Sequence, residues 1–358
     1  SKNLTYIVFL VAVFAVLSVL QPKKFLSYTN LQQMAFQIPE FGILALAMMV
    51  AVLSGGIDLS IISITNLAGI LSAIVLLSLS YPESLDLSML LGGIMAGKGE
   101  GAELVLHAPT GARMFFIILA AVSVSVGVGG VCGLLNGVLV SVVRIPPILA
   151  TLGTMKLYEG ISLVITKGSP ITSFPKPFLF LGSGTIWVMP VPMVIFAAFV
   201  ALTAVFLNRT RLGFSIYAVG ENAVAARFSG LKNRKILILT YLVSGLLSGV
   251  ATILIIARVD SVKVGYGTAF LLQAVLVVIL GGVSYLGGIG DVAGVVFGII
   301  ILRAISSGFN IMGFSNHFRN VIWGSMLVVV TVVNQIAPRI AERFRFGTAG
   351  AADKARGR

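Results

Sequence analysis

The chain has 358 residues, of which 58% are hydrophobic and only 10% are charged, and its mean hydropathy is +1.06. A soluble domain carries roughly 25% charged residues, so the composition excludes that class and predicts a membrane protein. The net charge of +13 would suggest nucleic acid in a soluble protein. In a membrane protein, basic residues that orient the spans explain it, and we expect no nucleic-acid partner.

Apolar blocks of about 20 residues recur along the chain and predict membrane-spanning helices. A transmembrane β-barrel would instead alternate apolar and polar residues in strands of about 10 residues. We therefore expect an all-α, polytopic membrane protein with about ten transmembrane helices. The predicted spans are residues 4–20, 31–54, 57–80, 114–143, 145–166, 188–207, 236–257, 267–281, 289–307 and 319–336. The eighth and ninth are short and separated by glycines, so one of them could be re-entrant.

The spans form one predicted domain over residues 1–345, and residues 346–358 are expected to be a disordered basic tail. The longest outer segment, residues 81–113, mixes glycines, charges and short apolar runs. Two interpretations of this segment stay open: a re-entrant or amphipathic surface piece, and a connecting loop.

The longest polar segment well inside the apolar chain covers residues 208–235 and carries six of the 25 basic residues. Its middle, residues 221–229, has alanines and one arginine at helical spacing. This pattern predicts a short helix with Gly220 and Gly230 as its stops. A polar helix between two spans indicates contact with a soluble partner. An ordinary loop that orients the spans is the alternative.

Basic residues concentrate in the cytoplasmic segments of membrane proteins. If both termini are cytoplasmic, then Lys2, Arg144, the 208–235 segment and residues 337–358 face inward, which accounts for 14 of the 25 basic residues. An even number of spans is consistent with this orientation.

Small residues recur four apart at Gly129, Gly133 and Gly137, and again at Gly290, Gly294 and Gly298. Seams of this kind let helix backbones approach closely in lipid. They predict a tightly packed bundle and say nothing about a substrate.

Ionisable groups in apolar sequence are candidates for function, because they are costly inside a bilayer. Asp58 follows Gly55-Gly56, and Asp291 follows Gly290. Each aspartate is expected to cap the helix that follows it, and a role at a gate is the alternative.

Four further ionisable residues lie within predicted spans. Lys156 and Glu159 are three residues apart on one helix face and are expected to pair. Arg303 is expected to snorkel or to pair rather than to bind a ligand. Glu40 is a candidate without an assigned partner.

Motifs for catalysis are absent from the sequence. It contains no GxxxxGK[ST] phosphate-binding loop and no GxSxG nucleophile motif. Its two histidines and its single cysteine, Cys132, form no metal-ligand pattern. We therefore expect no enzyme activity, metal or cofactor in this chain. If the chain is a transporter, it has no motor of its own and needs an external energy source.

Five separated stretches resemble the permease subunits of bacterial ribose-type (simple-sugar) ABC importers, in the family's order. They are LSGGIDLSIISI (53–64), RIPPILATLGTMKLYEGISLVITKGSPI (144–171), RTRLGFSIYAVGENAVAARFSGL (209–231), ILGGVSYLGGIGDVAGVVFGIIIL (279–302) and SSGFNIMGFSNHFRNVIWGSMLVVVTVVN (306–334). The resemblance runs from about residue 31 to 335. It implies a fold similar to the ten-helix permeases of vitamin B12-type importers, in the bacterial cytoplasmic (inner) membrane.

The resemblance also implies the partners: a second permease copy or a paralogue, two ABC ATPase subunits that use ATP and Mg²⁺, and an extracytoplasmic sugar-binding protein. The ATPase would drive alternating access through the cytoplasmic helix. Carried over residue by residue, the ATPase-coupling positions are Glu221, Asn222, Ala225, Arg227 and Gly230. The candidates for a wetted translocation path are Asn66, Asn136 and Gln273, each of which could equally form an interhelical hydrogen bond.

The sequence departs from the family in two places, the 81–113 loop, which is longer than in most relatives, and one motif. Many relatives carry acidic residues in a Gly-x-Glu-Leu-x-Ala-Ile stretch, whereas residues 265–274 here read GYGTAFLLQA, so any role of those acids does not transfer. Two alternatives stay open: an ion-coupled secondary transporter, for which Asp58 and Asp291 are the only support, and a related importer of nucleosides or branched-chain amino acids.

Overall fold

A computed structural model describes residues 2–81, 111–315 and 317–333. Most of the 81–113 segment and the whole predicted tail, 346–358, lie outside the described residues. The helices are α1 Lys2–Leu20, α2 Pro22–Phe25, α3 Tyr28–Leu53, α4 Ile61–Ser80, α6 Ala112–Ser141, α7 Pro147–Thr166, α8 Lys176–Ser183, α9 Val191–Arg209, α10 Arg211–Glu221, α11 Ala223–Phe228, α12 Asn233–Val259, α13 Thr268–Leu280 and α14 Val292–Ile311. A last helix, His317–Val333, follows.

Two small antiparallel pairs, which the sequence did not predict, join the loops at one end of the bundle. Strand β1 (Ile171–Thr172) pairs with β4 (Ser261–Val262), and β2 (Thr185–Ile186) pairs with β3 (Met189–Pro190). Each strand has two residues, so these pairs close loops and the protein stays mainly helical.

Seven described helices are long and apolar enough to cross a membrane: α3, α4, α6, α7, α9, α12 and α14. Three shorter apolar helices, Tyr6–Leu20, Thr268–Leu280 and His317–Val333, coincide with the remaining predicted spans. The 13 residues of α13 rise about 20 Å at about 1.5 Å per residue. The hydrocarbon core is about 30 Å thick, so α13 alone does not cross it.

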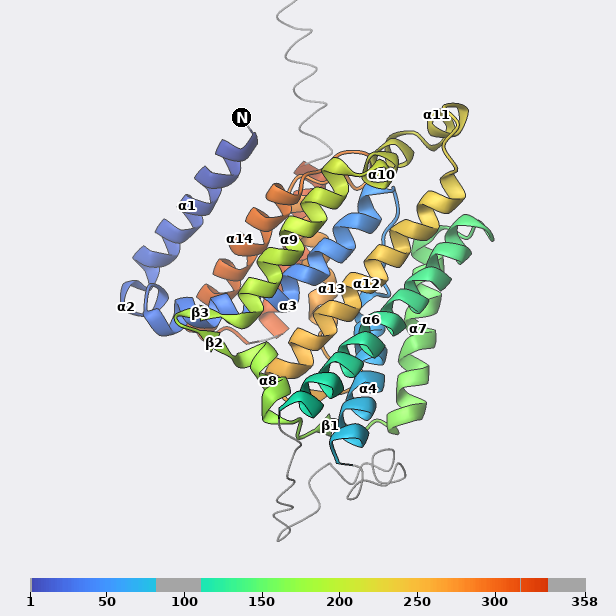
Figure 1. The fold of residues 1–358 in the computed structure, drawn as a ribbon. Coiled ribbons are helices and arrows are strands. Elements are labelled where there is room, and N and C mark those ends of the chain that lie inside the picture. Colours follow the sequence, from blue (N-terminus) through green and yellow to red (C-terminus); the bar gives the residue numbers. More distant parts are fainter. Residues whose placement is uncertain (1, 82–110, 316, 334–358) are drawn as a thin grey trace, which may run out of the picture.

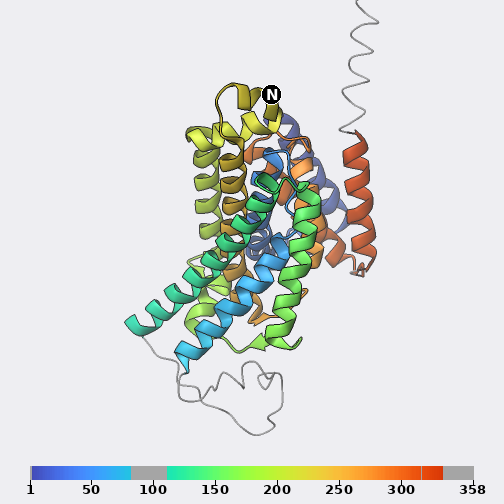
Figure 2. The same ribbon diagram turned by 90° about the vertical axis from the view of Figure 1, so that its right-hand side faces the viewer.

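Helix α3 lies at the centre of the bundle, with α9, α12, α13 and α14 against it (Figures 1 and 2). Its residues from Ile43 to Ala51 are completely buried in this chain. This part of the helix is hydrophobic on every side, as expected for a helix that is surrounded by protein. Helices α4, α6 and α7 form a second group beside α12, and α1 packs on the outer side of α14.

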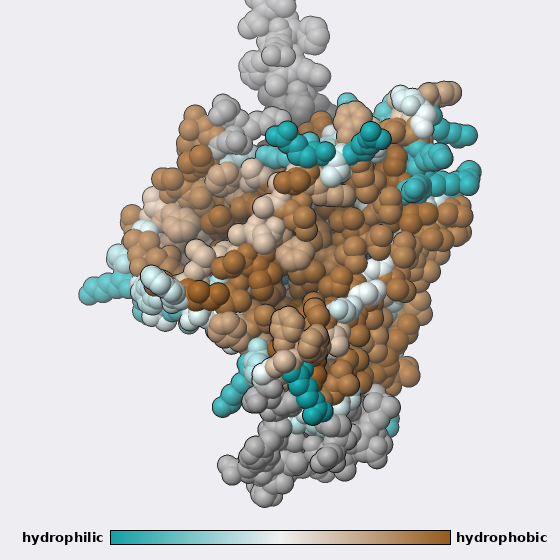
Figure 3. Space-filling view, in the orientation of Figure 1, coloured by the Kyte–Doolittle hydropathy of each residue, from teal (hydrophilic) through white to brown (hydrophobic). Residues whose placement is uncertain are grey.

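On the face of the molecule shown in Figure 3, hydrophilic residues gather at the two ends. A broad apolar surface lies between them, with hydrophilic groups above it near α10, α11 and the start of α12 and below it near α2 and α8 (Figure 3). The start of α1, the α10–α11 segment and the end of the last helix lie at the same end (Figures 1 and 2). This distribution fits a bilayer around the middle of the bundle.

The predicted glycine seam on α6 is confirmed, and its partner is α12. A Cβ added to Gly129 would meet the carbonyl oxygen of Gly245, and one added to Gly133 would meet that of Tyr241. In the second seam, a Cβ on Gly294 would meet the carbonyl oxygen of Gly281, so this glycine brings α14 against the end of α13. Gly290 precedes α14 and lies outside that seam.

Candidate coupling and translocation sites

The polar segment folds as two helices, so the prediction of a single helix over 221–229 is wrong in detail. Helix α10 runs through Gly220 and ends at Glu221, and α11 begins at Ala223. Asn222 separates them because its Oδ1 accepts hydrogen bonds from the amides of Val224 and Ala225, both 3.0 Å, as an N-cap does. Gly220 is therefore not a stop, whereas Gly230, at φ +83°, follows the end of α11 as predicted.

Helix α11 stands away from the bundle with most of its surface uncovered (Figure 1). Its buried residue is Ala226. Two large apolar side chains are exposed instead, Val224 at 65% and Phe228 at 88%. The predicted positions Glu221, Asn222, Ala225, Arg227 and Gly230 are all exposed too. Sequence reasoning missed Val224 and Phe228, although two large apolar residues four apart on a short helix within a polar segment are a signal for a docking face.

Basic side chains surround this end of the molecule. A hollow of about 690 Å³ lies between the end of α6 and the start of α12. Its basic lining residues are Arg144, Arg227, Lys232, Arg234 and Lys235. The charge agrees with the inward orientation predicted from the sequence.

The end of α10 touches two glycine turns of the bundle, backbone against backbone. A Cβ on Gly220 would meet the carbonyl oxygen of Leu53, at the end of α3, and the amide of Gly288 at 2.6 Å. A Cβ on Gly287 would meet the amide of Gly55 at 2.6 Å. Both Gly55 and Gly287 have positive φ, at +83° and +92°. Only glycines permit this junction, in which α10 contacts the α3–α4 turn and the α13–α14 loop together.

A tyrosine ties the same helix to the start of α14. The Tyr217 hydroxyl donates a hydrogen bond of 3.0 Å to the carbonyl oxygen of Gly290. Burial and the nearby charge of Asp291 raise the pKa of Tyr217, so the phenol stays protonated and remains a donor.

Asp58 is completely buried and connects three helices. Its Oδ1 accepts from the Ser60 amide (3.1 Å) and hydroxyl (2.7 Å). The same oxygen accepts from Asn136 of α6 at 3.5 Å, and Oδ2 accepts from Ser244 of α12 at 3.0 Å. The aspartate is thus not the N-cap, which is Ser60, and α4 begins at Ile61 rather than at residue 57. The carboxylate holds the turn to α6 and α12.

Asp291 does occupy the N-cap position of α14, but its side chain makes no capping hydrogen bond. The two Gly-Asp sequences therefore differ. Asp58 is buried with four donors around it, whereas Asp291 is exposed.

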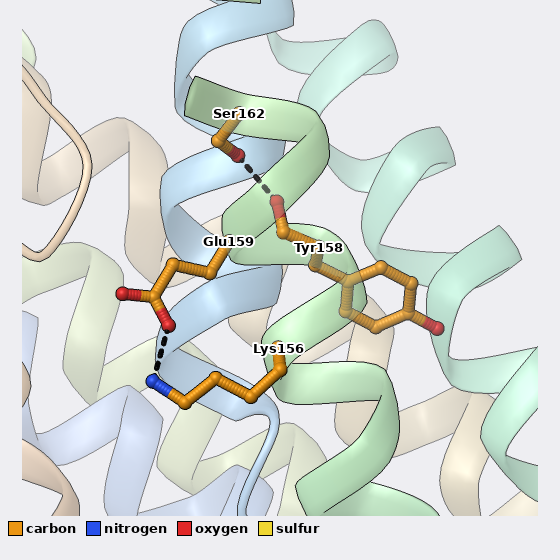
Figure 4. Close-up of polar contacts among 4 residues, drawn as sticks. All are labelled: Lys156, Tyr158, Glu159 and Ser162. Atoms are coloured by element: carbon orange, nitrogen blue, oxygen red, sulfur yellow. Dashed lines mark hydrogen bonds and ion pairs between the residues drawn. The ribbon is translucent and has the colours of Figure 1, made fainter. Parts of the chain in front are cut away.

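Lys156 and Glu159 pair as predicted, with Nζ and Oε2 2.7 Å apart (Figure 4). Their side chains are 70% and 34% exposed, although both lie in the middle of α7. Tyr158 points to the opposite side (Figure 4), where its hydroxyl donates to the carbonyl oxygen of Cys132 in α6 at 3.0 Å. An exposed charged pair at mid-span does not fit a lipid-facing surface.

The charged pair opens onto a small hollow of about 200 Å³. Its lining comes from α4, α7, the loop before α13 and α13 itself, and it includes Ser63, Asn66, Gly265 and Thr268. With its amide oriented to satisfy both groups, Asn66 donates to the carbonyl oxygen of Tyr266 and accepts from the amide of Gly265, each at 3.2 Å.

The three predicted pathway residues are not brought together. Asn66 lies at the hollow, whereas Asn136 is fully buried and donates to Ser60 at 2.7 Å. That contact is the interhelical hydrogen bond that the sequence left as the alternative. Gln273 is 7% exposed, and its Oε1 has no hydrogen-bond partner among the described residues.

Glu40 has a partner that the sequence could not indicate. It is buried in α3 and forms an ion pair with Arg258. The pair joins α3 to the last turn of α12. Residues 40 and 258 are far apart in sequence, so only the fold brings them together.

The structure is that of a polytopic membrane protein, with seven apolar spans, a polar two-helix segment at one end and a charged hollow at mid-span, an arrangement typical of the transport class. Among the described residues, no group of His, Cys, Asp or Glu could hold a metal ion. Residues 30–331 match the family model described as the permease component of the branched-chain amino acid transport system. The chain belongs to this permease family.

Individual relatives extend the match over almost the whole chain. The ribose import permease protein of Escherichia coli K12 is 30% identical over 329 residues, which cover 91% of each chain. The D-allose transport system permease protein of the same strain is 29% identical, covering 91% of this chain and 90% of its own. The autoinducer 2 import system permease protein of Yersinia enterocolitica is 28% identical, covering 83% and 80%. No solved structure matches.

Proposed function

We propose that this chain is the membrane-spanning subunit of an ATP-driven ABC importer that carries a simple sugar, delivered by an extracytoplasmic binding protein. The membership in the permease family and the ribose, allose and autoinducer 2 relatives support this class of solute. The observation that carries the proposal is α11: a helix at the basic end of the molecule with Phe228 88% exposed. A chain without a nucleotide-binding motif needs such a contact with an ATPase.

The coupling positions are then Glu221, Asn222, Ala225, Arg227 and Gly230, with Val224 and Phe228 as apolar anchors. Large exposed apolar side chains framed by polar ones are typical of the energetic centre of an interface. Movement of α11 reaches the bundle through α10, because Gly220 touches both glycine turns. The α3–α4 turn leads directly to Asp58, which holds α6 and α12.

The solute path runs along the face of α4, α7 and α13 that carries Lys156, Glu159 and Asn66. An ion pair that is exposed at mid-span requires either water or a second protein surface beside it. The proposed topology in a bacterial inner membrane has ten membrane segments and both termini cytoplasmic. The seven long spans, α1 and the last helix cross the bilayer, and the 13-residue α13 enters it without crossing alone. A fold like that of vitamin B12-type permeases remains part of this proposal.

A second copy, or a paralogue, packs against the same face of α7. Gly153 and Gly160 have nothing within 4 Å of an added Cβ, so this side of the helix is open, and small residues favour helix association in membranes. Oxidative cross-linking of Gly160→Cys should give a covalent dimer, whereas Gly127→Cys on α6 should not. Equal cross-linking of both variants would contradict this interface.

Coupling is tested by co-purification. Arg227→Glu, or deletion of residues 221–229, should abolish recovery of the ATPase subunit with the chain, while the amount of chain in the membrane stays unchanged. A complex that is retained and fully active would refute the assignment. Uptake into proteoliposomes that requires ATP and is unaffected by an ionophore separates the importer from an ion-coupled transporter.

The ion-coupled alternative is not supported by Asp58. Its buried carboxylate already accepts four hydrogen bonds from protein groups, three at Oδ1 and one at Oδ2, so protein donors satisfy most of its acceptor sites. The identity of the sugar is tested on the binding protein, by mass spectrometry of the ligand that co-purifies with it.

A further inference from the structure

Arg303 does neither of the two things that its sequence position predicts. It lies in α14 and is only 7% exposed, so its guanidinium does not snorkel to the surface. It forms no ion pair with any described residue, since the pairs found there are Lys156–Glu159 and Arg258–Glu40. Within the described part of the chain, its guanidinium donates a hydrogen bond from Nη2 to the main-chain oxygen of Gln37, 3.2 Å away, and its Nε has no partner there.

A buried guanidinium in this state is unusual. Arginine has five N–H donors and is always charged, and a buried charge without a counter-charge costs several kcal/mol. The ring of Phe41, 5.9 Å from the guanidinium carbon, stabilises it only partly, because a cation–π contact contributes about 2 kcal/mol at a desolvated site, less than the cost of burying the charge. Something else must balance the charge.

The guanidinium borders a hollow of about 240 Å³ between the start of α3, the end of α14 and the last helix. This end of α3 is opposite to α11 (Figure 1). One water occupies about 30 Å³ of liquid, so the hollow accommodates a group much larger than water. Its lining is Asn30, Gln33, Met34, Gln37, Arg303, Ser306, Ser307, Asn310 and Arg319.

The lining chemistry selects an anion. It contains two guanidinium groups and no carboxylate. The remaining polar groups are amides and hydroxyls, which donate to an oxyanion. The end of α14 adds a partial negative charge of about half a unit, and the start of α3 offsets it with a partial positive charge. The full positive charge of the buried Arg303 guanidinium therefore determines the sign of the potential.

The hydrogen bonds among the lining residues leave the Arg303 side of the hollow open. Ser307 donates to Asn30 Oδ1 at 2.7 Å, and the Asn30 amide donates to the Phe25 carbonyl oxygen at 2.8 Å. These bonds fix the wall of the hollow and connect α3 to α14. They involve neither the Arg303 guanidinium nor the side chains of Gln33 and Gln37.

We propose that this hollow, bounded by α3, α14 and the last helix, binds a phosphate-type anion with Arg303 as its buried counter-charge. The anion is either the headgroup of an acidic phospholipid or a free phosphate group, since the hollow lies at the end of the spans, where the two are chemically alike. The site is separate from the α4–α7–α13 face, so it does not depend on the proposed transport function.

The test is thermal unfolding of the purified full-length chain in a neutral detergent. Inorganic phosphate is added against chloride at equal ionic strength, and phosphatidylglycerol is added against phosphatidylcholine. The wild type should show a Tm higher by several degrees with phosphate, with phosphatidylglycerol, or with both, and the effective probe identifies the source. No shift with either, or a shift that chloride or phosphatidylcholine reproduces, would overturn the proposal.

Two variants distinguish the site from surface charge. Arg303→Met removes the counter-charge and should abolish the shift. Gln37→Glu keeps the size of a lining residue and supplies a carboxylate of the chain's own, so it should raise the Tm without an anion and lose the response to one. Lys235→Gln, on the basic hollow at the opposite end, should respond like the wild type. A response that persists in both Arg303→Met and Gln37→Glu would refute the site.

Discussion

The amide of Gly288 donates a hydrogen bond of 2.9 Å to the carbonyl oxygen of Leu53. This bond joins the α13–α14 loop to the last residue of α3. Gly220 of α10 lies against both partners. The three segments meet directly before α11, so a force applied to α11 acts on two glycine turns of the bundle at once.

Gly220→Ala should separate ATP hydrolysis from transport. The new methyl group would meet the Leu53 carbonyl oxygen, and overpacking of this kind costs about 1–3 kcal/mol. We expect transport in proteoliposomes to fall about tenfold or more, which corresponds to a loss of about 1.4 kcal/mol or more of coupling free energy. The ATPase activity of the complex should persist. Gly127→Ala, which meets no atom within 4 Å, is the control and should transport normally.

Phe228→Asp should weaken ATPase binding without affecting the fold. The side chain is 88% exposed, so its replacement should change the free energy of unfolding by no more than about 0.5 kcal/mol. The loss of an interface anchor costs about 2 kcal/mol or more, which is about a 30-fold rise in Kd, measurable by titration of the ATPase. Phe228→Tyr keeps the ring and should bind normally. Unchanged affinity in Phe228→Asp would place the interface elsewhere.

Asp58→Ala should destabilise the bundle severely. It leaves the Ser60 amide and the hydroxyls of Ser60 and Ser244 without this acceptor at fully buried positions, and each such group costs about 1–3 kcal/mol. Thermal unfolding in detergent should show a large fall in Tm. Asp58→Asn retains one acceptor oxygen and should be milder. Asp291→Ala, at an exposed residue without a capping bond, should have little effect.

The double variant Lys156→Met, Glu159→Gln should fold and fail to transport. The ion pair is exposed, so its removal should change stability by about 1 kcal/mol or less. If the pair lines the solute path or the contact with a second copy, uptake should fall about tenfold. Lys167→Gln, beyond the end of α7, is the matched control. Uptake equal to that of the wild type would remove α7 from the path.

Much of the architecture was predictable, because the spacing of apolar blocks is fixed by the thickness of the bilayer. The seven long spans and the three shorter apolar helices all coincide with predicted segments, and the seam at Gly129 and Gly133 is confirmed. Helix starts were less predictable. Residues 57–60 were assigned to the same span as α4, but buried hydrogen bonds from Ser60 to Asp58 hold them in a turn.

The sequence by itself determined the class of protein, the positions of the spans and the polar segment between α9 and α12, since each depends on residues that are close together in the chain. Tertiary structure alone decided the rest. Glu40 meets Arg258, Gly220 meets Leu53, and Arg303 borders a polar hollow without a counter-charge from any residue that the structure describes. These relationships join residues far apart in sequence, and their energies arise from burial, which a local pattern does not contain.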